Sequence, residues 1–280
     1  MEFETLVLII SFIISIILGF IIIPILRKLK VGQIERDDGP QSHLKKQGTP
    51  TMGGLIMIAT MILVVTGIYL FLTFNNQSEI ANKILPILLV AIGFSLIGFI
   101  DDFKKLVLKN TEGLKPSYKM LGLLIISVAY VVYLVYGLKL GTDTYIPVVK
   151  QYITIPVYIY IPFAIVVMLA TTNAVNLTDG IDGLSSSVSA IIVTCLTVIG
   201  ITLNMTEISI FGSVVIGAIL GFLMFNLHPA KVFMGDTGSL LLRRSYLSYG
   251  IILKIAIVVN SNSTNTSIRD IISNYSSSIF

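Results

Sequence analysis

The chain has 280 residues, of which 55% are hydrophobic and only 12% are charged, with a formal net charge of +4. So few charges cannot cover a water-soluble domain of this size, and the mean hydropathy of +0.92 with recurring apolar runs predicts a polytopic membrane protein. The single cysteine, Cys195, excludes an intramolecular disulfide framework. One cysteine with two separated histidines, His43 and His228, argues against a structural zinc site.

The first apolar run, at about 5–26, is longer than a signal-peptide core, follows no basic residue and lacks a small-residue cleavage site. We therefore expect a retained membrane helix there. Further membrane helices are expected at about 53–74, 84–101, 118–137, 155–172, 186–203 and 207–225, with a weaker one at about 238–259. The segment 138–154 is β-branched with a turn signal at 141–143, which predicts a short hairpin. The expected fold is all-α, an integral membrane protein with about eight transmembrane helices.

The basic residues sort by face. Loops after the first, third, fifth and seventh helices share one side of the membrane, and twelve basic residues lie in or beside them: Arg27, Lys28, Lys30, Arg36, Lys45, Lys46, Lys104, Lys105, Lys109, Lys115, Lys119 and Lys231. The other loops hold three: Lys83, Lys139 and Lys150. The positive-inside rule then predicts that the first set is cytoplasmic and that the N-terminus is outside.

Four polar clusters fall on this same predicted cytoplasmic face. They are "KKQGTPTMGG" (45–54), "GFIDDFKK" (98–105), "NAVNLTDGIDGL" (173–184) and "FNLHPAKVFMGDTGSL" (225–240). Random loop chemistry would distribute such clusters over both faces. One aqueous site built from four loops explains the placement better.

The carboxylates in these clusters are candidates for chemistry. Adjacent Asp101 and Asp102 at a membrane boundary are costly, so they indicate function by default. They could hold a divalent metal or act as a general base or nucleophile. The alternative is a helix end that reaches water and is neutralised by Lys104 and Lys105. Asp179 and Asp182 each precede a glycine, and their alternative role is helix capping.

The segment 233–239, "FMGDTGS", places Asp236 between glycines immediately before an apolar run. Thr237 or Ser239 could cap that helix, whose N-terminus would favour an anion. Carboxylates without clustered sulfur or histidine ligands select magnesium or manganese. With lysines, glycine-rich loops and an apolar scaffold, this pattern favours phosphoryl transfer between a soluble donor and a lipid acceptor.

The motifs resemble the polyprenyl-phosphate N-acetylhexosamine-1-phosphate transferase superfamily. The matching strings are "GTPTMGG" (48–54), "DDFKK" (101–105), "NAVNLTDGIDGL" (173–184) and "PAKVFMGDTGSL" (229–240), and the resemblance covers about 1–241. "GTPTMGG" and "NAVNLTDG" are most similar to the phospho-N-acetylmuramoyl-pentapeptide transferase branch. This resemblance implies transfer of phospho-N-acetylmuramoyl-pentapeptide from its UDP donor to undecaprenyl phosphate, with Mg²⁺, giving lipid I and UMP for peptidoglycan synthesis.

The same resemblance implies roles for individual residues. The implied catalytic residues are Asp101, Asp102 and Asp179, and the implied magnesium ligand is Asp236. The implied substrate-binding residues are Lys46, Thr51, Lys105, Lys119, Asn173, Asn176, Gly180, Ile181, Asp182 and Phe233. Phe233 would stack on uracil, and the aspartate pair would either deprotonate the lipid phosphate or attack the donor first. The resemblance also implies a bacterial inner-membrane location with a cytoplasmic site, a homodimer, and no nucleic-acid partner.

The sequence departs from the family after residue 241. The family has about ten helices and a histidine-rich motif in a late cytoplasmic loop, and this sequence has no such motif. We expect a transferase membrane domain at 1–241, an aberrant last helix at 242–259 that contains Arg243, Arg244 and Lys254, and a disordered polar tail at 260–280. A shifted reading frame near Leu241, or truncation there, would explain this departure and predicts weak or absent transferase activity.

Three other functions compete with this one. A sister enzyme would transfer N-acetylglucosamine-1-phosphate from its UDP donor to undecaprenyl phosphate. A non-catalytic remnant would bind the UDP-sugar without turnover. A cation-coupled transporter is disfavoured, because its ionisable residues would lie near the membrane midplane rather than at one face.

Overall fold

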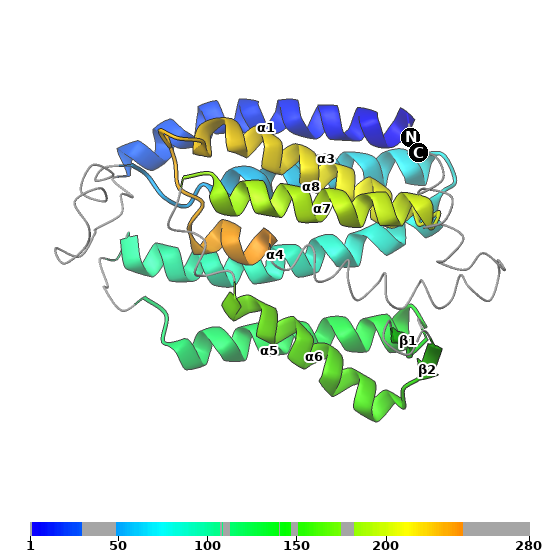
Figure 1. The fold of residues 1–280 in the computed structure, drawn as a ribbon. Helices are drawn as coiled ribbons and strands as arrows, with labels where there is room; N and C mark the ends of the chain where they lie inside the picture. The colour runs from blue at the N-terminus through cyan, green and yellow to red at the C-terminus, as the bar shows by residue number, and fades with distance from the viewer. Residues whose placement is uncertain are drawn as a thin grey trace, which may run out of the picture.

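Long apolar helices that run side by side make up most of the molecule (Figure 1). The computed structural model describes residues 2–29, 49–106, 108, 113–139, 141–146, 151–174 and 182–242. Its helices are α1 (Glu2–Lys28), α3 (Gly54–Phe74), α4 (Ser78–Leu106), α5 (Pro116–Val132), α6 (Val157–Ala174), α7 (Leu184–Thr202) and α8 (Thr206–Asn226). A π-helical turn, η1 (Tyr133–Gly137), continues α5, and residues 235–242 are also helical.

The expected all-α, polytopic membrane architecture is confirmed. Within the described ranges, six helices are long and apolar enough to cross a membrane: α1, α3, α4, α5 with η1, α7 and α8. The apolar part of α6, Val157–Leu169, is shorter. Of the helix expected at about 238–259, only the first part lies within the described residues, and it begins at 235 rather than 238.

A two-stranded hairpin connects α5 to α6, as the sequence predicts. Strand β1 (Asp143–Ile146) pairs antiparallel with β2 (Gln151–Thr154), and Asp143 lies opposite Thr154. The hairpin lies at the end of the bundle away from the C-terminal end of α4 (Figure 1).

Helix α8 forms the centre of the larger helix group and packs against α1, α3, α4 and α7. Small residues let α1 and α8 approach closely: a Cβ at Gly217 would lie 2.4 Å from the carbonyl oxygen of Leu8. The Ser15 hydroxyl also donates a hydrogen bond to the Ala218 carbonyl across this contact, at 2.9 Å. Contacts between small residues are the usual means by which membrane helices associate.

Helix α4 joins two parts of the molecule. One part contains α3 and α8, and the other contains α5, which in turn packs against α6 (Figure 1). The C-terminal end of α4 carries Asp101 and Asp102, so residues from both parts can reach these carboxylates.

Candidate functional site

A short backbone pairing holds two of the sequence clusters together. The Phe233 N–H donates to the Pro50 carbonyl at 2.8 Å, and the Gly53 N–H donates back to the Phe233 carbonyl at 2.8 Å. The Gly54 N–H donates to the Met234 carbonyl at 2.9 Å. Residues 50–54 and 233–234, far apart in the sequence, therefore form one hydrogen-bonded unit. Buried Thr51 and half-buried Phe233 both belong to this unit.

The helix at 235–242 packs directly on the start of α3. A Cβ at Gly54 would lie 2.2 Å from the Gly238 nitrogen, so only glycine fits at position 54. At the N-terminal end of the 235–242 helix, Gly235 has a φ of 72°, a left-handed conformation that favours glycine. The glycines of both motifs therefore permit a close backbone contact beside the carboxylates of α4.

Asp102 caps the helix at 235–242 from outside it. Its Oδ1 accepts a hydrogen bond from the Asp236 N–H at 3.1 Å, and its Oδ2 accepts from the Thr237 N–H at 2.8 Å. The Thr237 hydroxyl donates to the same Oδ2 at 2.6 Å. Asp102 is 5% exposed. A carboxylate at a helix N-terminus is favoured by the orphan N–H groups and by the helix dipole.

Asp101 contacts the segment before α5, Lys119 of α5 and Lys105 of its own helix. Its Oδ1 accepts from the Leu114 N–H at 2.7 Å, and its Oδ2 accepts from Lys105 Nζ at 2.9 Å and from Lys119 Nζ at 3.0 Å. Both lysines also donate to Asp236 Oδ2, Lys119 at 2.9 Å and Lys105 at 3.3 Å. We call Asp101, Lys105, Lys119 and Asp236 the charged quartet.

The charged quartet is balanced and partly accessible. Two carboxylates face two ammonium groups, so its formal charge is zero. The Asp101 side chain is 3% exposed, whereas those of Lys105 and Asp236 are 40% and 20% exposed. Phosphate oxygens arriving from solvent can reach the lysines, because the lysine side chains are partly exposed. They can replace the carboxylates there, since lysine forms the same charge-assisted hydrogen bonds with phosphate as with carboxylate.

Asp236 is the quartet member best suited to a magnesium ion. Among the described residues, no three His, Cys, Asp or Glu side chains lie together as a metal cluster. Magnesium does not need such a cluster, since it commonly uses one or two carboxylates with water and substrate phosphates. Within the described ranges, both lysine contacts of Asp236 involve Oδ2. The donor set therefore fits a magnesium ion shared with a phosphate ligand.

Asp182 belongs to a second set of polar contacts, which involves two of the sequence clusters. Its Oδ2 lies 3.0 Å from Nδ1 of His228 and accepts from the Ala230 N–H at 3.4 Å. Asn226 supports the same turn, donating to the Val232 carbonyl at 3.0 Å and accepting from the Ser186 hydroxyl at 2.7 Å. Asp182 thus ties the start of α7 to the segment that leads to Phe233.

The structure brings several predicted site residues to one end of the bundle. Asp101, Asp102, Lys105, Lys119 and Asp236 are linked directly or through the 236–237 backbone. Asn173 lies in the last turn of α6, and nothing is described of its side chain. Five predicted residues lie outside the described ranges: Lys46, Asn176, Asp179, Gly180 and Ile181.

Sequence reasoning missed how the helix at 235–242 is capped. Neither Thr237 nor Ser239 caps it in the expected manner, since the Thr237 hydroxyl donates to Asp102 and the Ser239 hydroxyl donates to the Asp236 carbonyl at 3.3 Å. The role of the Leu114 N–H was also missed. No local signal marks either contact, because the partners are more than ten residues apart.

Comparisons with known proteins agree with the motifs. A family model described as glycosyl transferase family 4 matches residues 84–254. The chain is 43% identical over 255 residues to the phospho-N-acetylmuramoyl-pentapeptide-transferase of Acetivibrio thermocellus, covering 90% of this chain and 74% of that protein. It is 46% identical over 254 residues to the protein of the same name from Halalkalibacterium halodurans, covering 91% and 76%. For Clostridium acetobutylicum the identity is 42% over 250 residues, covering 89% and 76%.

Proposed function

The chain belongs to glycosyl transferase family 4, and from this premise we propose that it is a phospho-N-acetylmuramoyl-pentapeptide transferase. It transfers the phospho-sugar peptide from UDP to undecaprenyl phosphate, giving lipid I and UMP. The similar proteins from three bacteria all carry this name. They favour this function over transfer of N-acetylglucosamine-1-phosphate, the alternative that the motifs left open.

The charged quartet is the observation that carries the chemistry. Two lysines and two carboxylates meet at one end of a bundle of membrane-spanning helices. This is where a soluble diphosphate and a lipid phosphate can meet. An oxygen of the acceptor phosphate attacks the sugar-linked phosphorus of the donor, and the bond from that phosphorus to UMP breaks.

Lys105 and Lys119 bind the donor diphosphate in this proposal. Each lysine now divides its hydrogen bonds between Asp101 and Asp236. When phosphate oxygens arrive, the ammonium groups turn to them, which leaves Asp236 available for magnesium. Asp236 would hold a magnesium ion, which would supply neutralisation of the charge that develops on the leaving UMP. The metal and the donor should therefore bind together more tightly than either binds alone.

Asp102 acts as a positioning residue for Asp236. It holds the 236 and 237 N–H groups at the end of the 235–242 helix. Asp182, with His228, positions the segment before Phe233, which would stack on the uracil ring. The roles of Asp179, Asn173, Asn176, Gly180, Ile181 and Lys46 as catalytic or substrate-binding residues stay predictions from the resemblance, as does a homodimer.

The site faces the cytoplasm in this proposal, and the N-terminus lies outside a bacterial inner membrane. The support is the distribution of basic residues, twelve on the site's side and three on the other. UDP-linked donors are cytoplasmic metabolites, so this orientation also brings the donor to the lysines.

The test measures UMP release and donor binding separately. The full chain in detergent receives the UDP-linked muramoyl-pentapeptide, undecaprenyl phosphate and Mg²⁺. Because the sequence departs from the family after residue 241, we expect only weak UMP release, which stops without lipid acceptor or with EDTA and is lost in Asp236→Asn. UDP-N-acetylglucosamine in place of the donor should release little UMP. Donor binding without UMP release would contradict the proposal and favour a non-catalytic remnant.

A matched titration tests the role of the quartet. Manganese binding, followed by its paramagnetic resonance signal, should tighten when UDP is present. The Lys83→Met variant is the control, because Lys83 pairs with exposed Glu79 at the opposite end of α4. Equal manganese affinity with and without UDP would contradict the shared site.

A further inference from the structure

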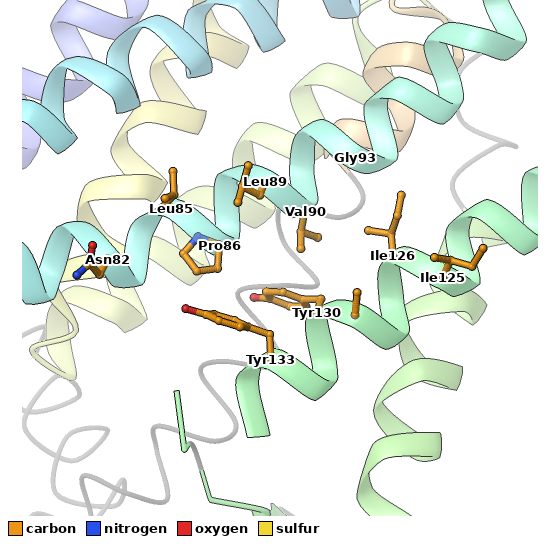
Figure 2. Close-up of a pocket in the computed structure, with 11 residues that line it drawn as sticks. Asn82, Leu85, Pro86, Leu89, Val90, Gly93, Ile125, Ile126, Tyr130 and Tyr133 are labelled. Carbon is orange, nitrogen blue, oxygen red and sulfur yellow. The ribbon is translucent and has the colours of Figure 1, made fainter. Parts of the chain in front are cut away.

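A cavity lies between α4 and α5. Its volume is about 590 Å³, within the range of about 300–1,000 Å³ that is usual for small-ligand sites. One helical stripe of α4 lines it, from Asn82 to Gly93, and the facing stripe of α5 and η1 runs from Ile125 to Tyr133. Figure 2 shows Tyr130 of α5 and Tyr133 of η1 extending toward Pro86 of α4.

The cavity occupies the half of the membrane span that is remote from the charged quartet. Along α4, Gly93 and Asn82 precede Asp101 by 8 and 19 residues. At 1.5 Å per residue, the cavity therefore runs from about 12 Å to about 28 Å from Asp101 along the helix axis. A phosphate or metal ion bound at the charged quartet would therefore not occupy this cavity.

The walls suit a hydrocarbon chain. The buried floor includes Pro86, Val90 and Tyr130, and the rim consists of exposed apolar side chains, such as Leu89 and Ile125, which are 58% and 60% exposed among the described residues. Water would find few hydrogen-bond partners along these walls, so a cavity of this size would not be stably filled by water. It opens toward lipid tails instead.

Polar groups gather at one end of the cavity. Asn82 and the Tyr133 hydroxyl lie at the end remote from Asp101 (Figure 2). The Tyr69 hydroxyl of α3 donates to Asn82 Oδ1 at 3.4 Å. At the same end, the helix of α5 changes to the π-helical turn η1, a feature that often marks functional sites.

We propose that this cavity binds one acyl chain of a phospholipid from the leaflet opposite the charged quartet. The chain lies between α4 and α5, and the headgroup lies by Asn82 and Tyr133. A polyprenyl phosphate from the reaction side would place its phosphate at the other end, where the cavity has no polar group within the described residues. The position of the polar end therefore selects a phospholipid of the opposite leaflet. This inference does not rest on the proposed function.

A bound acyl chain would set the distance between α4 and α5. These two helices carry Asp101 and Lys119 of the charged quartet at their other ends. The phospholipid is then a structural ligand whose loss loosens the α4–α5 contact and weakens the link between Lys119 and Asp101.

The test fills the cavity with the aromatic side chain of a phenylalanine. The full chain is reconstituted in nanodiscs of dioleoyl-phosphatidylethanolamine and dioleoyl-phosphatidylglycerol, released into detergent, and measured by native mass spectrometry. Ala129→Phe places a ring in the cavity, and Val128→Phe places the same ring on α5 outside its lining. We expect one retained phospholipid in the parent chain and in Val128→Phe, and loss of that phospholipid in Ala129→Phe. Equal retention in all three overturns the proposal.

A second measurement does not depend on the folding of Ala129→Phe. The chain has no tryptophan, so Tyr133→Trp gives a single reporter at the polar end of the cavity. Phospholipid brominated on its acyl chain should quench this reporter at a lower mole fraction than it quenches Tyr158→Trp, since Tyr158 is 76% exposed on α6. Identical quenching curves overturn the proposal, as does retention of polyprenyl phosphate in place of phospholipid. A change of oligomeric state in Ala129→Phe with lipid retention intact also overturns it, because a second copy would then fill the cavity.

Discussion

The two faces of α4 contact their neighbours in different ways. On one face, Asp102, Gly98 and Ser95 contact the 235–242 segment, and a Cβ at Gly98 would lie 2.3 Å from the Asp236 carbonyl oxygen. On the other face, Asp101 reaches α5 through Lys119, and the same interface contains a cavity farther along. Hydrogen bonds to backbone groups thus join Asp102 and Ser95 to the 235–242 segment, whereas exchangeable lysine ion pairs join Asp101 to Asp236 and to α5. A ligand can compete for the ion pairs but not for the backbone contacts.

Asp102→Asn should have the largest effect, because it disrupts the hydrogen bonds between Asp102 and the start of the 235–242 helix. An amide offers one acceptor oxygen where the carboxylate now accepts three hydrogen bonds, and its NH₂ group would face N–H donors. Each buried group left unpaired costs about 1–3 kcal/mol. We expect a marked fall in thermal stability together with loss of UMP release.

Glu79→Gln is the control for this variant, since it removes a carboxylate at the exposed end of α4. It should leave the melting temperature unchanged. If Asp102→Asn lost activity with the parent melting temperature, Asp102 would act in the chemistry directly and the difference between the two faces would disappear.

Gly54→Ala should come next, because its new methyl group meets backbone atoms. The added Cβ would lie 2.2 Å from the Gly238 nitrogen and 2.3 Å from the Gly238 Cα, so the 235–242 helix must move. Overpacking of this kind typically costs about 1–3 kcal/mol. Gly67→Ala in the same helix meets nothing within 4 Å and gains about 1 kcal/mol of helix propensity. Opposite shifts in melting temperature would sharpen the contrast, and equal shifts would contradict it.

Lys119→Met tests the ion-pair side. Asp101 keeps its hydrogen bonds from Lys105 and the Leu114 N–H, and Asp236 keeps Lys105, so the fold should persist. A hydrogen bond to a charged group contributes about 1.5–3 kcal/mol, which corresponds to an increase in the Kd of UDP of about tenfold to a hundredfold. Calorimetry of UDP binding measures it, with Lys83→Met as the unaffected control. Unfolding of Lys119→Met, with no folded chain left to titrate, would show that this face is structural after all.

The sequence predicts the helices well, because each apolar run must cross the membrane. It also predicts that four polar clusters share one face, since that follows from counting crossings. Helix α4 extends to Leu106, beyond the expected end near 101, and Lys105 reaches back one turn to Asp101. The i,i+4 spacing of Asp101 and Lys105 could have indicated this extension.

The sequence does not predict which partners the two adjacent carboxylates find. Consecutive helical residues point about 100° apart, so Asp101 and Asp102 must face different neighbours. Which neighbours they meet depends on contacts between segments more than a hundred residues apart, such as Asp102 with Thr237. The sequence does not predict the cavity either, because it depends on how the side chains of α4 and α5 pack against each other. Neither helix sequence alone shows that these side chains leave a space between them.

Ser95→Ala should give the smallest effect and separates the two kinds of contact most cleanly. Ser95 and Ser127 are both fully buried. The Ser95 hydroxyl donates to the Thr237 carbonyl at 2.8 Å, whereas the Ser127 hydroxyl donates to the Leu123 carbonyl one turn back in its own helix at 2.7 Å.

Loss of the hydrogen bond between elements should cost about 1 kcal/mol in Ser95→Ala. Ser127→Ala should be near neutral, because alanine's higher helix propensity, worth about 0.5 kcal/mol, offsets the local hydrogen bond. Chemical denaturation in detergent compares the two variants directly. Both variants remove a serine hydroxyl, and only the hydrogen-bond partner differs. A larger loss of stability in Ser127→Ala than in Ser95→Ala would therefore contradict the greater importance of the contact between α4 and the 235–242 helix.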